Sequence, residues 1–118
     1  MPLLWHMRKI NRLLSNDDFT RVLNGGNKIK EDSFLVACVP NSLGHLRVGI
    51  SVSKKVGNAV TRVRIRRQVR AIIGSLDLIA EQVDLVILPK PGFLKKSHGE
   101  NLASLKNAVT VLLNRRRK

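Results

Sequence analysis

Five arginines occupy the nine positions from 62 to 70 of this sequence, and two lysines, Lys54 and Lys55, stand shortly before them. The planar guanidinium group offers a fork of donors to phosphate oxygens, and it also stacks on unpaired bases. Basic side chains at this density therefore indicate phosphate binding, and arginine suits irregular RNA better than a lysine-rich tail would. The chemistry expected of this segment is recognition of a polyanion.

A solvated helix face is the alternative explanation for this cluster. Solvated helices usually alternate charges to form i,i+4 pairs, whereas no Asp or Glu interrupts the stretch from Val52 to Leu76. The whole chain has 22 Lys and Arg against 8 Asp and Glu, which gives a formal net charge of +14. Both observations favour a nucleic-acid partner over a merely solvated surface.

The sequence offers no arrangement of side chains typical of a protein-borne catalytic or metal site. The histidines His6, His45 and His98 lie far apart, and none has a Cys, Asp or Glu at metal-ligand spacing. The single cysteine, Cys38, sits in an apolar run and is expected to be a buried strand residue. A GxxxxGK[ST] phosphate loop is absent from the chain. We therefore predict no catalytic residue and no bound metal, and a self-sufficient nuclease is disfavoured.

The size and composition of the chain indicate one folded domain. Hydrophobic residues make up 43% of the 118 residues, enough to offset the entropy of ordering the chain. We expect a single domain over residues 1–118, with residues 1–7 and 115–118 flexible. No apolar run approaches the roughly 20 residues that cross a bilayer, so no membrane partner is expected and the cytoplasm is the predicted compartment.

The arginine cluster is predicted to lie on a helix over residues 59–75. Asn58 is a good N-cap for this helix. At 100° per residue, the apolar side chains fall on one side and the arginines sweep around the other. The predicted buried side consists of Ile65, Val69, Ile72, Ile73 and Leu76.

Two further helices are expected on either side of this segment. Ser15 can cap a first helix that ends at Gly25 and Gly26. Ser97 and Glu100 form a capping-box signature for a last helix.

Three apolar segments indicate strands. Residues 33–40 and 46–53 are predicted to pair as an antiparallel hairpin, and residues 83–88 form a nearly continuous apolar strand. A weak pattern near residues 28–30 suggests an extra edge strand. The predicted order is αββαβα, in which the arginine helix makes a βαβ crossover in an α+β fold, an α/β sandwich with a mixed sheet.

In its motifs and in this order of elements, the chain resembles the protein subunits of bacterial ribonuclease P. The likeness is strongest over residues 47–60, RVGISVSKKVGNAV, and the arginine helix that follows them. It extends to residues 11–13 with Asp18 and Phe19, and to residues 88–92, LPKPG. The resemblance implies a two-layer α/β sandwich with a left-handed βαβ crossover, a handedness that general rules make rare.

The resemblance also implies a function in which the protein assists a catalytic RNA. The RNA subunit would carry the active site and require Mg²⁺, while one protein per RNA would help to bind precursor tRNA for removal of its 5′ leader. The protein alone would hold no cofactor. Carried onto this chain, the surface for the RNA subunit comprises Lys54, Lys55, Asn58, Arg62, Arg64, Arg66, Arg67 and Arg70, and a cleft for the leader is lined by Phe19, Phe34, Val36 and Lys90.

Two departures from the family pattern stand out. The family's Arg-Asn-Arg reads Arg62-Val63-Arg64 here, and Val63 falls within the arginine arc, either forfeiting one hydrogen bond with RNA or packing on a partner surface. The second concerns the cleft, where family aromatics are replaced by Leu23 and Ala37, so base stacking should be reduced. A ribosomal or other structural RNA-binding protein with a similar βαβ core is the alternative function.

Overall fold

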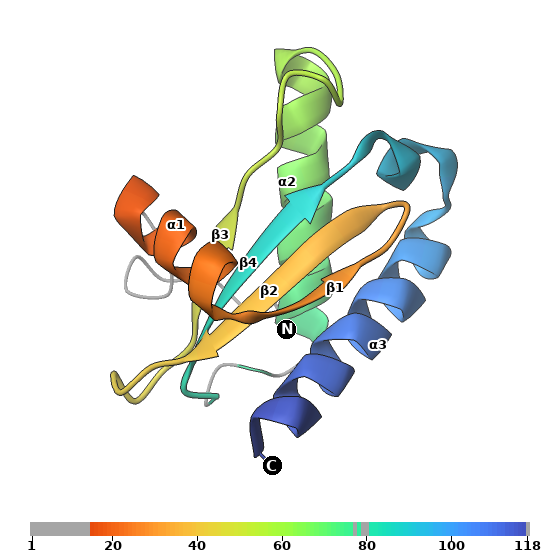
Figure 1. Ribbon diagram of the computed structural model, residues 1–118. Helices are drawn as coiled ribbons and strands as arrows, with labels where there is room; N and C mark the ends of the chain where they lie inside the picture. Colours follow the sequence, from red (N-terminus) through yellow and green to blue (C-terminus); the bar gives the residue numbers. More distant parts are fainter. Residues whose placement is uncertain (1–14, 77, 79–80, 118) are drawn as a thin grey trace.

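A computed structural model describes residues 15–76, 78 and 81–117 of the chain (Figure 1). The predicted order of helices and strands is confirmed, including the edge strand, and a short 3₁₀ helix is added after the last strand. Residues 1–7, for which flexibility was predicted, lie outside the described residues, and residues 115–117 prolong the last helix. The elements are α1 (Asn16–Gly25), β1 (Asn27–Lys30), β2 (Phe34–Pro40), β3 (Arg47–Ile50), α2 (Ala59–Ser75), β4 (Val83–Pro89), η2 (Pro91–Lys95) and α3 (His98–Arg117).

The four strands form one mixed sheet in the order β1-β2-β4-β3. β2 runs antiparallel to both β1 and β4, and β3 runs parallel to β4. The predicted hairpin between β2 and β3 is therefore wrong, because β4 lies between them. Every residue of β4 from Val83 to Ile87 is buried, and a strand so apolar on both faces is stable in the middle of a sheet.

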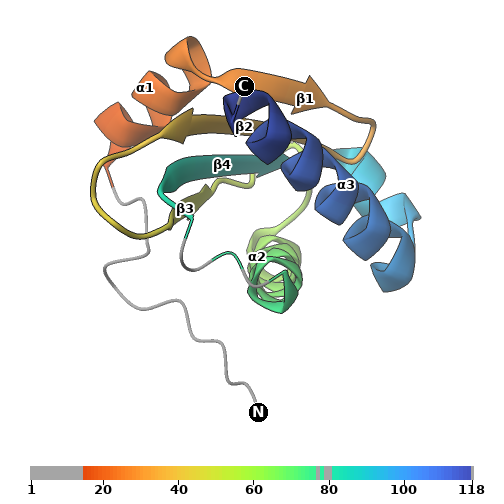
Figure 2. The same ribbon diagram turned by 90° about the horizontal axis from the view of Figure 1, so that it is seen from below.

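The crossover from β3 through α2 to β4 is left-handed, as the resemblance implied. In Figure 1 both strands run towards the top of the view and β4 lies to the right of β3. α2 passes behind the sheet, and Figure 2 shows it on the side opposite to α1.

Alternate residues of the central strands face two different layers. Phe34 and Val36 of β2 point into the larger core, which α2 and α3 cover. Ala37 of β2 and Val86 of β4 point to the other face, where they pack with Val22 of α1. The sandwich thus has its main helical layer on one face, and the single short helix α1 partly covers the opposite face (Figure 2).

All three helix starts predicted from local sequence are confirmed. The side chain of Ser15 accepts a hydrogen bond from the backbone N–H of Asp18 at 3.0 Å. The hydroxyl of Ser97 accepts from the N–H of Glu100 at 3.1 Å, and the carboxylate of Glu100 accepts from the N–H of Ser97 at 3.0 Å. These contacts satisfy N–H groups that the first turn of a helix leaves without partners.

The turn from α1 into β1 requires glycine. A Cβ atom at Gly26 would lie 2.7 Å from the carbonyl oxygens of both Val22 and Cys38. Because backbone atoms cannot yield like the end of a side chain, only glycine lets the chain turn this close to α1 and β2.

Candidate RNA-binding surfaces

We call the five arginines of α2 the arginine face; they sweep around the helix from the edge of its buried apolar side to the opposite side, and they are Arg62, Arg64, Arg66, Arg67 and Arg70. Ile65, Val69, Ile72 and Ile73 are buried in the main core, as predicted, and Leu76 is only partly buried against it. Of the arginines, Arg64 and Arg67 are exposed and the other three are half-buried. Burying the apolar side therefore orients Arg64 and Arg67 towards solvent, and the other three arginines flank the core.

The segment before α2 adds two lysines and a structural cap. Lys54 and Lys55 are exposed in the loop after β3. The side-chain oxygen of Asn58 accepts a hydrogen bond from the N–H of Thr61 at 2.9 Å. Asn58 therefore has a role in starting α2, whether or not it also touches RNA.

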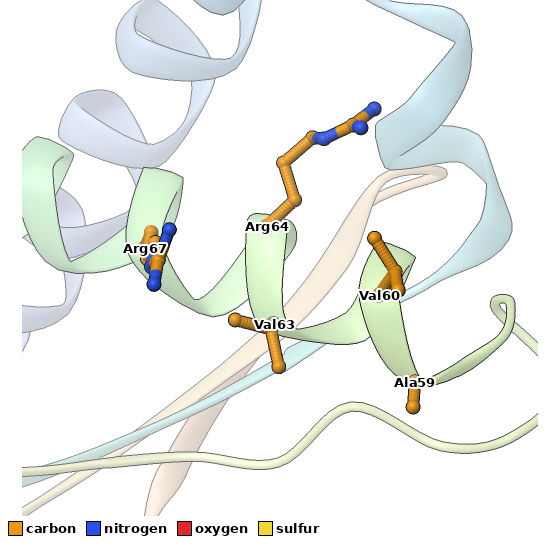
Figure 3. A pocket seen from close by; sticks show the side chains of 5 residues that line it. All are labelled: Ala59, Val60, Val63, Arg64 and Arg67. Carbon is orange, nitrogen blue, oxygen red and sulfur yellow. The ribbon is translucent and has the colours of Figure 1, made fainter.

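Two valines interrupt the basic surface near the start of α2. Val60 is 69% exposed and Val63 is 41% exposed, unusual fractions for large aliphatic side chains. Figure 3 shows them on one stretch of helix with Ala59, Arg64 and Arg67. We call Ala59, Val60 and Val63 the valine patch, an apolar area next to two cationic side chains.

A cleft of about 620 Å³ lies between one side of α1 and the sheet. Its α1 wall is polar at Asn16 and Thr20 and apolar at Phe19 and Leu23. The floor comes from the ends of the central strands and from the loop after β3. This α1 cleft is lined by Asn16, Phe19, Thr20, Leu23, Leu35, Ser51, Ser53, Leu88, Pro89 and Lys90.

Of the four residues predicted to line a cleft, Phe19 and Lys90 lie in the α1 cleft and two do not. Phe34 and Val36 are 0% exposed and belong to the core under α2 and α3. Because successive side chains of a strand point to opposite faces, their neighbour Leu35 lines the cleft instead. The two-residue period of the strand was the signal that would have separated Leu35 from Phe34 and Val36.

Lys90 stands at one end of the α1 cleft with its ammonium group oriented by the backbone. Its Nζ donates a hydrogen bond to the carbonyl oxygen of Glu31 at 3.0 Å. An ammonium group has three hydrogens, so Lys90 can hold this contact and still donate to a phosphate.

The two surfaces meet at the loop between β3 and α2. Ser51 and Ser53 line the α1 cleft, and Lys54 and Lys55 follow directly along the chain. A nucleic acid on the arginine face and a single strand in the cleft can therefore be neighbours on one protein.

Sequence reasoning missed a buried charge beside α1. Asp84 of β4 is 0% exposed, and it accepts hydrogen bonds from Arg47 at 2.9 and 2.8 Å and from Asn41 at 2.9 Å. Arg21 of α1 completes the set by donating to the same carboxylate. Asp18 lies 3.5 Å from Arg21 and 3.6 Å from Arg47. A charged residue inside the apolar run of β4 was the available signal for such partners.

The pKa values in this network reflect its pairing. Burial by itself raises the pKa of Asp84, but hydrogen bonds from Arg47, Arg21 and Asn41 outweigh that effect and hold the pKa below its usual range. The hydrogen bond with Asp84 raises the pKa of both Arg21 and Arg47. All three groups are therefore charged near neutral pH, and the two arginines are committed to Asp84.

Within the described part of the chain, no three His, Cys, Asp or Glu side chains converge as a metal site would require. None of the described helices is long and apolar enough to span a membrane. What the molecule presents is a basic helix face and an adjoining apolar cleft with a lysine at its end.

An α+β domain that carries these two surfaces belongs to the class of RNA-binding proteins. The family model for ribonuclease P matches residues 7–113. The ribonuclease P protein component of Streptococcus thermophilus is 31% identical over 105 residues, which cover 89% of this chain and 95% of the relative. That of Enterococcus faecalis is 35% identical over 107 residues, covering 89% and 91%. The chain belongs to the ribonuclease P protein family.

A solved structure supports the same assignment. The RNase P protein of Staphylococcus aureus superimposes with a TM-score of 0.76 at 28% identity, over 86% of this chain and 94% of that one. The alternative of a ribosomal or other structural RNA-binding protein is not favoured by these relatives.

Proposed function

We propose that this chain is the protein subunit of a bacterial ribonuclease P, which binds the RNA subunit through the arginine face of α2 and the 5′ leader of precursor tRNA in the α1 cleft. The observation that carries the proposal is the junction of these two surfaces at residues 51–55. A leader held in the cleft would thereby run beside the RNA that α2 anchors.

Binding at the arginine face would rest on phosphate contacts. The exposed Arg64 and Arg67, with Lys54 and Lys55, can each neutralise a phosphate and release its counterions. The half-buried arginines have less freedom, so less side-chain entropy is lost when they bind.

Binding in the α1 cleft would rest on an apolar floor with a cationic end. Among the described residues that line the cleft, Phe19 supplies the aromatic ring, and Leu23, Leu35 and Leu88 supply aliphatic surface. One ring can stack on one base, which is worth about 1 to 3 kcal/mol. Lys90 would hold a phosphate at the end of the cleft.

In this proposal the RNA subunit performs catalysis with Mg²⁺, and the protein binds no cofactor of its own. Asp18 and Asp84, two carboxylates near α1, are both engaged by arginines and are poor candidates to ligate the ion. One protein per RNA and a cytoplasmic location complete the proposal.

Reconstitution with a bacterial ribonuclease P RNA tests this function. At low magnesium, adding the protein should stimulate cleavage of precursor tRNA at the 5′ end of the mature sequence. Absence of stimulation at every protein-to-RNA ratio would contradict the proposal. Cleavage by the protein without RNA would instead revive a protein-borne nuclease.

A further inference from the structure

Helix α1 uses opposite sides for the cleft and for the buried charge. Phe19 faces the cleft, whereas Arg21 lies about 160° around the helix from it, at 100° per residue. Arg21 is the α1 residue that pairs with Asp84, and Asp18 next to it adds contacts to Arg21 and Arg47. The α1 wall of the cleft is thus held in place by contacts on the opposite side of the helix.

Three successive positions of β4 on this face show how α1 crosses the sheet. Asp84 pairs with Arg21, Val86 belongs to the same small cluster as Val22, and Leu88 lines the cleft. The ion pair therefore lies at one end of the contact and the cleft at the other. A change at Asp84 would rotate or lift α1 about the packed Val22, and this would move the cleft wall.

The partners of Asp84 make it a rigid anchor. Arg47 begins β3 and Asn41 follows β2, so the Asp84 carboxylate connects α1 to the chain on both sides of β4. Asn41 is itself held, because its Nδ2 donates to the carbonyl of His45 at 3.2 Å and its Oδ1 accepts from the N–H of Leu43 at 3.0 Å. None of these contacts involves a residue that lines the cleft.

We propose that Asp84 is a positioning residue for leader recognition: through Arg21 it fixes α1 over the sheet and so sets the width of the α1 cleft. This inference rests on the proposed function, in which the cleft holds the leader. Asp84 is fully buried and cannot touch RNA itself. Its effect would be selective, because the arginine face of α2 lies on the opposite side of the sheet.

The competing explanation is that Arg21, which is 48% exposed, binds RNA directly. The two explanations predict opposite signs for Asp84→Asn. If Asp84 positions α1, the substitution lowers the affinity for the leader. If Arg21 binds RNA directly, the substitution leaves that contact intact or strengthens it, because Arg21 is freed from Asp84.

The test compares reconstituted complexes for binding to precursor tRNA and to tRNA without a leader. Asp84→Asn and Arg21→Met should each lower the preference for the leader on the order of tenfold, within the roughly 100-fold that a displacement of about 1 Å can cost. Affinity for the RNA subunit should stay unchanged. Lys28→Met, which removes one exposed positive charge on β1, is the matched control and should change neither quantity.

Each other outcome has a definite meaning. Full leader preference in Asp84→Asn would overturn the inference while leaving the proposed function standing. Equal binding of both tRNAs by the wild-type complex would overturn the assignment of the cleft and this inference with it. If Asp84→Asn does not fold, the methyl NMR resonances of Leu23 and Leu88 in free Arg21→Met decide: positioning requires them to shift, and unchanged resonances would overturn the inference.

Discussion

Arg47 donates two hydrogen bonds to the carboxylate of Asp84 across a pair of parallel strands. Its Nε donates to Oδ1 at 2.9 Å and its Nη2 donates to Oδ2 at 2.8 Å, and the two residues are direct neighbours in the register of β3 and β4. Although Arg47 belongs to the most family-like segment of the sequence, this pairing gives it a structural role inside a strongly basic protein.

Asp84→Asn should destabilise the protein by about 1 to 3 kcal/mol, because two partly exposed arginines lose their charged hydrogen-bond acceptor at a buried position. The measurement is the free energy of unfolding by urea at pH 7. Asp32→Asn, in an exposed turn, is the control and should stay within about 0.5 kcal/mol of the wild type. Equal stability of the two variants would contradict the assigned role of the ion pair.

The contribution of Asp84 to stability should vanish in acid. The pKa of Asp84 is lowered in the folded state. As the pH falls, the unfolded state therefore takes up the proton first, at the ordinary aspartate pKa of about 3.9. The stabilisation is therefore complete above about pH 5 and is lost as the pH falls towards the folded pKa. Unfolding of the wild type and of Asp84→Asn at several pH values should show their difference shrinking below about pH 4. A constant difference would contradict the lowered pKa.

Substitutions of Asn58 should separate capping from RNA binding. Asn58→Ala removes the acceptor for the N–H of Thr61 and should cost about 1 kcal/mol of stability. Asn58→Asp keeps a good cap, so its stability should match the wild type, but its negative charge should weaken binding to the RNA subunit. Unchanged RNA affinity in Asn58→Asp would place residue 58 away from the bound phosphates.

Arg67 and Val63 should affect RNA binding in different ways. Arg67→Ala should weaken binding and make the dependence of log K on log salt shallower by about 0.7 to 0.9, because one phosphate contact is lost. Val63→Asn should tighten binding by the net value of one hydrogen bond, about 0.5 to 1.5 kcal/mol, with the salt slope unchanged. Titrations at several salt concentrations measure both. Weaker binding by Val63→Asn would show instead that the valine patch packs on the RNA.

Phe19→Ala should reduce recognition of the leader without lowering the affinity of the protein for the RNA subunit. The loss of one stacked base predicts a decrease of about 1 to 3 kcal/mol in the affinity for precursor tRNA relative to leaderless tRNA. Phe34→Leu is the comparison, because Phe34 lies in the core on the other face of the sheet. A selective loss in Phe34→Leu, but not in Phe19→Ala, would refute the assignment of the cleft.

Local sequence was enough to predict where the helices begin and which side of α2 is buried. The caps at Ser15, Asn58 and Ser97 each bond to a residue three positions along the chain, and the apolar side of α2 follows from a period of 3.6 residues. The buried side of α2 and its cap at Asn58 could therefore be predicted from the sequence, and the structure adds that Arg64 and Arg67 are the exposed members of the arginine face.

The order of the strands and the lining of the cleft depended on contacts between distant residues. No local pattern placed β4 between β2 and β3, because β4 pairs with segments more than 30 residues away along the chain. The two-residue period of β2 puts Phe34 and Leu35 on opposite faces, but which of those faces borders the cleft was known only from the layers that cover them. Asp84 looked like an isolated charge until folding brought Arg21 and Arg47 to it. The sequence by itself determined an amphipathic helix with a basic face, and tertiary packing decided which residues line the neighbouring cleft and which support its wall, because that packing joins residues far apart in the chain.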